Sequence, residues 1–135
     1  MLKYAGVHNR HMNYWLLKTE PSAFSIDDLK QKKRAPWDGV RNYQARNNLR
    51  SMRPHDQVLI YHSSTKVPSV VGVGEVVGEA FPDESQFDPQ SHYFEPKAVR
   101  GEREPWIART VSFRSKLKRE VPLEEIKGKE ELKDM

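Results

Sequence analysis

The sequence contains no cysteine, and this absence removes several classes of function. Without thiols the chain has no disulfide, no thiolate metal ligand and no cysteine nucleophile, which is compatible with a reducing compartment. It also lacks any apolar run near the ~18 residues of a membrane-spanning helix. Its first residues lack the apolar centre of a signal peptide. We therefore predict a cytoplasmic protein without a membrane partner.

Patterns for metal binding, catalysis or cofactors are weak. His55, His62 and His92 have no metal-ligand spacing. His62 and Ser63 are neighbours, but adjacent strand residues point to opposite faces and no elbow motif surrounds the serine. The stretch GVGEVVG at 72–78 lacks the spacing of a dinucleotide fingerprint. We predict no catalytic residue, no cofactor and no metal.

What the sequence does have is separated charge, with a formal net charge of +4. Residues 30–53 carry eight Lys/Arg against the single acid Asp38, whereas residues 75–104 carry eight acids and three bases. Such asymmetry is typical of a face that docks on a polyanion. A solvated basic helix without a ligand would have the same composition.

The order of apolar runs and chain breakers predicts one α+β domain. We expect strands at 13–18, 56–63, 69–81 and 106–117, and helices after Ser25, at 42–53 and at 121–128. Residues 32–40 and 82–105 are expected to be loops. No regular βαβ alternation occurs, which favours a mostly antiparallel sheet or small barrel flanked by helices.

The helix expected at 42–53 separates its side chains by type. At about 100° per residue, three apolar side chains share a stripe that faces the core: Ala45, Leu49 and Met52. Three arginines share the adjacent face beside Tyr43: Arg46, Arg50 and Arg53. Grouped guanidinium groups match phosphates by bidentate hydrogen bonds, so this face is a candidate phosphate contact.

Trp37, which lies just before this helix, has two interpretations. It could stack on a base, an interaction of roughly 1–3 kcal/mol, or it could fill the core. Asp38 and Asn42 could read the edge of a base or could cap the helix. The residues alone leave both alternatives open.

Six segments, in this order, resemble the EVE domain family: WLLKTEP (15–21), FSIDDL (24–29), WDGVRNYQARNNLRSM (37–52), YHSS (61–64), VVGVGEVV (70–77) and AFPDESQFD (80–88). The resemblance implies a PUA-like fold related to YTH domains, a mixed or antiparallel β pseudo-barrel with flanking helices. We expect a disordered extension at 1–12 and a single EVE domain at 13–135. EVE domains usually continue into a further strand, and because this sequence stops at 131–135 we expect that strand to be lacking.

The resemblance also implies a non-catalytic module that binds nucleic acid and holds a modified base, flipped into an aromatic pocket. C5-modified cytosine in DNA (5-methylcytosine or 5-hydroxymethylcytosine) is the ligand most associated with the family. The alternatives are a PUA-like module for modified or structured RNA, and a base-modifying enzyme that uses Asp38, Asp83 or His62 as general acid or base. Nucleoid association and delivery of a partner nuclease or other effector stay open.

Motif positions assign the expected roles. Trp37 would stack on the base, and Asp83 would accept from its edge. The expected ligand-binding set is Lys18, Thr19, Trp37, Asp38, Asn42, Tyr43, Arg46, Tyr61, Ser63 and Asp83. The expected phosphate-contacting set is Arg41, Arg46, Arg50 and Arg53. Trp106 is expected to be structural.

Overall fold

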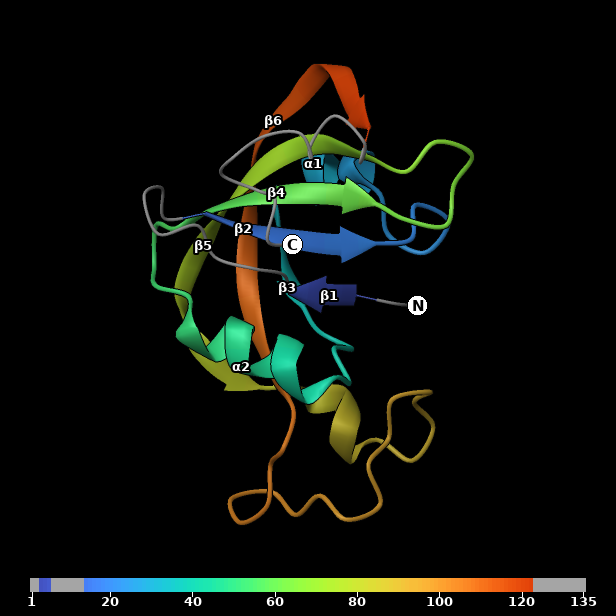
Figure 1. Ribbon diagram of the computed structural model, residues 1–135. Coiled ribbons are helices and arrows are strands. Elements are labelled where there is room, and N and C mark those ends of the chain that lie inside the picture. Colours follow the sequence, from blue (N-terminus) through green and yellow to red (C-terminus); the bar gives the residue numbers. More distant parts are fainter. Residues whose placement is uncertain (1–2, 6–13, 123–135) are drawn as a thin grey trace.

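The computed structural model describes residues 3–5 and 14–122, which form a single curved sheet with two α-helices beside it (Figure 1). The elements are β1 (Lys3–Ala5), β2 (Tyr14–Thr19), α1 (Ile26–Lys32), β3 (Arg34–Trp37), α2 (Tyr43–Ser51), β4 (Gln57–His62), β5 (Ser69–Pro82), the 3-10 helix η1 (Glu84–Phe87) and β6 (Ile107–Pro122). The strand order is β1-β2-β4-β5-β6-β3. β2 and β4 are parallel and the other pairs are antiparallel. The predicted α+β class is confirmed, with a mixed sheet that forms an open rather than a closed barrel in the described residues.

The two longest strands bend the sheet around the core. β5 and β6 have 14 and 16 residues and pair along most of their length, with three shifts of register. Such bulges increase the local twist and bend of a strand. Gly72 permits the closest packing, because a Cβ there would lie 2.4 Å from Cδ1 of Ile26 on α1. Gly72 and Gly74 therefore permit close packing of the sheet, whereas a Cβ at Gly78, which has a φ of 72°, would meet nothing within 4 Å.

α1 begins as predicted. Ser25 caps the helix by accepting from the Asp28 amide, and the Asp28 carboxylate accepts from the Ser25 amide. The amide of Ile26 donates to Nε2 of His62 at 3.0 Å. The end of β4 therefore holds the beginning of α1.

α2 is shorter than predicted. Asn42 caps its start, and Met52 is already extended (ψ 148°) before Pro54. The predicted apolar stripe is confirmed, because Ala45, Leu49 and Met52 are all buried. Arg53, however, lies beyond the helix and is not on its arginine face.

The C-terminal end of α2 is held by a buried cation that sequence reasoning missed. Arg109 on β6 is only 1% exposed and donates to the carbonyl groups of Leu49 (3.1 Å), Met52 (2.6 Å) and Gly78 (2.6 Å). A cation is favourable at a helix C-terminus because it offsets the partial negative charge there. Burial lowers the pKa of Arg109, opposed by the charges of Glu79 and Asp56.

Several boundaries differ from the prediction. Residues 34–37, expected in a loop, form β3 because they pair with β6 from Arg34↔Ser112 to Trp37↔Arg109. Lys3–Ala5 form β1 inside the extension expected to be disordered at 1–12. β6 continues through Pro122, so the helix expected at 121–128 does not begin there; its residues from 123 on lie outside the described part. Among the described residues, 3–5 and 14–122, no helix is long and apolar enough to cross a membrane.

Candidate functional site

A buried carboxylate, Asp83, joins the loop before α2 to the loop after β5. It is 1% exposed and accepts hydrogen bonds from the Gly39 amide (2.8 Å), Arg41 Nη1 (3.0 Å) and the Ser85 amide (2.9 Å). The Ser85 hydroxyl also donates to it. Burial acts to raise the pKa of Asp83, but hydrogen bonds from Ser85, Gly39 and Arg41 together outweigh it and lower the pKa. Asp83 is therefore an ionised carboxylate whose acceptor sites face the protein.

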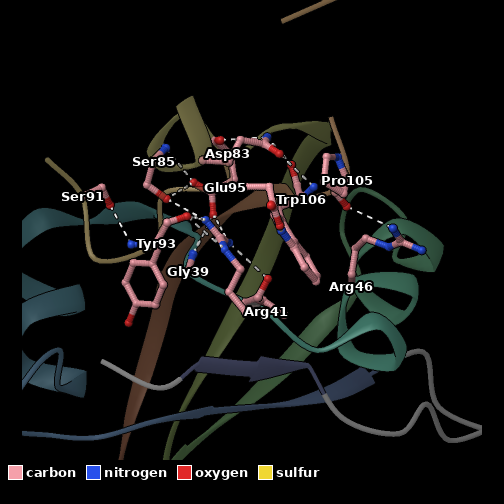
Figure 2. Close-up of polar contacts among 12 residues, drawn as sticks. Gly39, Arg41, Arg46, Asp83, Ser85, Ser91, Tyr93, Glu95, Pro105 and Trp106 are labelled. Carbon is pink, nitrogen blue, oxygen red and sulfur yellow. Dashed lines mark hydrogen bonds and ion pairs between the residues drawn. The ribbon is translucent and has the colours of Figure 1, made fainter. Parts of the chain in front are cut away.

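Arg41 completes this arrangement (Figure 2). Besides Asp83, its guanidinium donates to the Ser85 hydroxyl (3.0 Å) and to the Tyr93 carbonyl (2.8 Å). It lies near the Tyr93 ring at 5.2 Å and near the Trp106 ring at 5.3 Å. We call Gly39, Arg41, Asp83 and Ser85 the Asp83 frame. Arg41 and Asp83, expected to contact a phosphate and a base edge, here bond to each other and to the surrounding loops.

The long loop after η1 is closed at its base by Gln86. This fully buried side chain donates to the Trp106 carbonyl at 2.7 Å and accepts from the Trp106 amide at 3.1 Å. Trp106 is buried, as expected for a structural residue, and its Nε1 donates to Glu95 at 3.4 Å. These bonds fix the loop that carries Tyr93.

The carboxyl ends of β2 and β4 meet because these strands are parallel. Lys18 pairs with Tyr61 and Thr19 with His62, and the Ser63 amide donates to the Thr19 carbonyl at 3.0 Å. The two faces of the sheet nevertheless separate the predicted residues. Thr19 is fully buried, with its hydroxyl donating to the Phe24 carbonyl.

Tyr61 belongs to a second apolar cluster with Leu16 and Val70, on the opposite face from Leu17 and the main core. The Lys18 ammonium lies over the Tyr61 ring at 5.6 Å. Lys18 and Tyr61 are therefore separated by the sheet from Thr19, although all three belong to the ligand-binding set expected from the sequence.

Two hydroxyl groups in this region are buried without a hydrogen-bond partner among the described residues: Ser63 Oγ and the Tyr93 phenol. The Tyr93 ring packs on Gly39, where a Cβ would lie 3.2 Å from it. Burial raises the pKa of Tyr93; Arg41 opposes this shift, whereas Asp38 and Glu20 reinforce it. The phenol is thus neutral at physiological pH and able to donate.

Glu20 lies beside the turn that carries Ser63, and its charge also acts on the Tyr93 phenol. It follows Thr19, the backbone partner of Ser63, and accepts from the Ser64 hydroxyl at 3.3 Å. We call Glu20, Asp38, Ser63 and Tyr93 the strand-end site. An unpaired buried hydroxyl costs about 1–3 kcal/mol, so a ligand that bonded these groups would recover that cost.

Trp37 lies in the core in this structure. Its side chain is 0% exposed and its ring meets that of Phe24 edge to face, with centroids 6.0 Å apart. Asn42 accepts from the Ala45 amide at 3.0 Å, so its side chain caps α2. Of the alternatives left open by the sequence, the structure shows the packing position for Trp37 and the capping position for Asn42.

The outer surface of α2 carries the remaining predicted residues. Tyr43 is 61% exposed and stacks on Trp106, with centroids 4.9 Å apart. The Arg46 guanidinium lies 4.9 Å from the Tyr43 ring centroid and donates to the Pro105 carbonyl at 3.1 Å. Arg50 is exposed one turn later.

Most of the site residues that sequence reasoning missed come from the polar segment 82–105; Glu20 after β2 and Gly39 after β3 are the others. Ser85, Gln86, Tyr93 and Glu95 all support the site from this segment. One local signal was present: the spacing of Asp83 and Ser85 is that of an Asx turn, in which a carboxylate accepts from an amide two residues on. Within residues 3–5 and 14–122, no group of three or more His, Cys, Asp and Glu is placed to hold a metal ion.

The EVE domain model matches residues 13–135. Mouse thymocyte nuclear protein 1 is 44% identical in an alignment of 126 positions, which covers 85% of this chain and 55% of that protein. The chain thus spans about half the length of the curated relatives it matches.

Two solved structures are close in fold. A hypothetical protein from Leishmania major has a TM-score of 0.84 and 50% identity, covering 92% of this chain and 78% of its own. The human THYN1 protein, crystallised in complex with 5-methylcytosine-containing DNA, has a TM-score of 0.79 and 39% identity, covering 84% and 72%. The PUA-like fold expected from the resemblance is confirmed by these neighbours, and the chain belongs to the EVE domain family.

Proposed function

We propose that this domain is a non-catalytic module that binds DNA and reads 5-methylcytosine. The observation that carries the proposal is the human relative, 39% identical over 84% of this chain, which was crystallised with DNA containing that base. The proposal concerns binding by residues 13–135, because the curated relatives are about twice as long.

The strand-end site offers chemistry that suits a cytosine. Cytosine presents an exocyclic amine, which a carboxylate can accept from, and Asp38 and Glu20 supply carboxylates there. Its ring also carries acceptors, for which the Tyr93 phenol and the Ser63 hydroxyl are donors without a partner among the described residues. A base flipped out of the duplex is read by such bonds together with contacts to its faces.

The phosphates would be held by the basic surface around α2. Arg46, Arg50 and Arg53 are at least partly accessible to solvent, and grouped guanidiniums bind phosphate oxygens. Arg41 is left out of this set because its donors bond to Asp83, Ser85 and Tyr93. Binding should therefore weaken strongly between about 50 and 200 mM salt, as counterion release requires.

The other predicted residues take supporting roles in this proposal. Asn42 positions α2, and Thr19 anchors the turn after β2. Asp83 holds Arg41, which in turn donates to the Tyr93 carbonyl. Trp37 forms the packed wall behind Asp38 and Gly39, and stacking on it would require the core to open.

The test is a titration of labelled short oligonucleotides, followed by fluorescence anisotropy. DNA and RNA strands would each carry cytosine, 5-methylcytosine or 5-hydroxymethylcytosine at one position. We expect tightest binding to 5-methylcytosine DNA. Ser63→Ala and Tyr93→Phe each remove only an unpartnered hydroxyl, so they should fold at least as stably as wild type and lose about fivefold in affinity for that strand.

Arg50→Gln is the matched control, because it should weaken modified and unmodified strands equally. Equal binding of wild type to every strand would refute base reading and leave a basic surface only. A preference for RNA would favour the RNA-binding alternative. Release of an altered base during long incubation would show an enzyme instead.

A further inference from the structure

Four planar side chains form a continuous stack from the strand-end site to the surface of α2. The Tyr93 ring lies 5.2 Å from the Arg41 guanidinium carbon, which lies 5.3 Å from the Trp106 ring centroid. Trp106 in turn lies 4.9 Å from the Tyr43 ring centroid. We call Tyr93, Arg41, Trp106 and Tyr43 the stacked column.

The inner end of the column is buried and its outer end is open. Tyr93 and Arg41 are half-buried and Trp106 is buried, whereas Tyr43 is 61% exposed. Tyr43 is the most exposed of the large hydrophobic side chains in the described residues. Its ring is backed by Trp106, so it presents aromatic surface to solvent in a fixed orientation.

Positive charge accompanies this ring. The Arg46 guanidinium lies over the ring, 4.9 Å from its centroid, and donates to the Pro105 carbonyl and to Oδ1 of Asn47 at 2.9 Å. Arg50 follows one turn later on the same helix. An aromatic ring bordered by guanidiniums and amides, rather than by other apolar groups, suits a planar and anionic partner.

We infer that Tyr43 is a second nucleotide-binding position. The base of a nucleotide flanking the modified one takes the place of the Arg46 guanidinium over the Tyr43 ring, and Arg46 turns outward to contact the intervening phosphates together with Arg50. This inference rests on the proposed function. Every base has a stacking face, so this position adds affinity without selecting sequence. The stacked column holds it at a fixed separation from the strand-end site.

The test compares Tyr43→Ala, Tyr43→Leu and Tyr43→Phe in the same anisotropy titration. Leucine keeps an apolar cover over Trp106 without an aromatic ring, and phenylalanine keeps the ring. The alanine and leucine variants should lose about tenfold in affinity for 5-methylcytosine and cytosine strands alike. Their preference for the modified strand should be unchanged, and phenylalanine should bind as wild type does.

An abasic scan locates the partner. A missing base at one position beside the modified cytosine should weaken wild type but have no further effect on Tyr43→Ala. The mononucleotide 5-methyl-dCMP, which has no flanking base, should bind wild type and Tyr43→Ala equally.

Wild-type affinity in both Tyr43→Ala and Tyr43→Leu would overturn the inference. A collapsed preference for the modified strand in those variants would overturn it too, because the ring would then belong to the base-reading site. The proposed function fails separately, if wild type itself shows no preference.

Discussion

The Asp83 frame and the strand-end site lie side by side but differ in how their polar groups are satisfied. In the frame, Asp83 accepts four hydrogen bonds and Arg41 donates to four residues, Val40, Asp83, Ser85 and Tyr93. In the strand-end site, the Ser63 and Tyr93 hydroxyls are buried without a partner in the described residues. Tyr93 joins the two regions, because its carbonyl accepts from Arg41 of the frame while its phenol belongs to the strand-end site.

The difference indicates which polar groups are bonded within the protein and which are left for a ligand under the proposed function. A fully bonded network is rigid, whereas a buried group without a partner is costly and is retained where something else compensates it. Motif positions predicted ligand contacts for Arg41 and Asp83. In the structure their polar groups bond to each other and to the surrounding loops, which fits a scaffold for the neighbouring strand-end site.

Trp37→Ala should give the largest loss of stability, and it tests whether Trp37 belongs to the packed scaffold or to the ligand site. Truncating a fully buried tryptophan should lower the free energy of unfolding by about 3–5 kcal/mol, measured by urea denaturation. Trp37→Phe is the control and should recover most of that loss and keep DNA binding. An alanine variant that stays within about 1 kcal/mol of wild type, yet no longer binds, would place Trp37 in the ligand site.

Asp83→Ala should have the next largest effect. It leaves the Arg41 cation and the Gly39 amide without their acceptor, and breaking a buried ion pair costs about 3 kcal/mol when one partner stays partly solvated. Asp83→Asn keeps a neutral acceptor and should lose less. If Asp83→Ala were as stable as wild type but bound no DNA, Asp83 would be a ligand contact and the frame a misassignment.

His62→Gln should have the smallest effect on stability. Because His62 precedes Ser63 of the strand-end site, its titration allows that region to be compared with the Asp83 frame as pH changes. Burial lowers its pKa below the usual 6.5, with Glu120, Asp27 and Asp28 opposing this shift and Lys116 adding to it. Because the folded state resists protonation, this contribution to stability is complete above about pH 6.5 and is lost as pH falls through the folded pKa. Stability should therefore decline on acidification less steeply in His62→Gln, which keeps an acceptor for Ile26.

The NMR shift of the Ile26 amide reports this titration directly. It should move with His62 on acidification, because His62 Nε2 is its acceptor. The Gly39 amide should not move over the same range, because Asp83 holds it and has a lowered pKa. Parallel movement of both amides would mean that the two regions respond as one.

Elements defined by local chemistry were predictable. The capping box at Ser25 and the apolar stripe of Ala45, Leu49 and Met52 depend on neighbours within one or two helical turns. β3 could not be found this way, because RAPW contains a proline and is a strand only through its pairing with β6. The Asp83 frame was equally hidden, since Arg41 and Asp83 are 42 residues apart.

The candidate site was predicted in part, for a related reason. The motifs indicated the ends of β2 and β4, and Ser63 does lie there. They did not show on which face of the sheet each side chain lies. Tyr61 and Thr19 were therefore placed in one ligand-binding set, although the sheet separates them. Tyr93 lies in a segment without periodicity, and only the closure of that loop by Gln86 brings it to the site.

The pairing of β3 with β6 also has a consequence for the order of folding. The β4–β5 pair joins residues that are close in the sequence, with His62 opposite Ser69, whereas the β3–β6 pair must bring Arg34 to Ser112. Distant pairings form late because the entropy of closing a long loop is lost before their contacts compensate it. A nascent or refolding chain should therefore complete its central strands first and pair β3 last, so that the Asp38 and Gly39 turn after β3 is placed only in the final folding step.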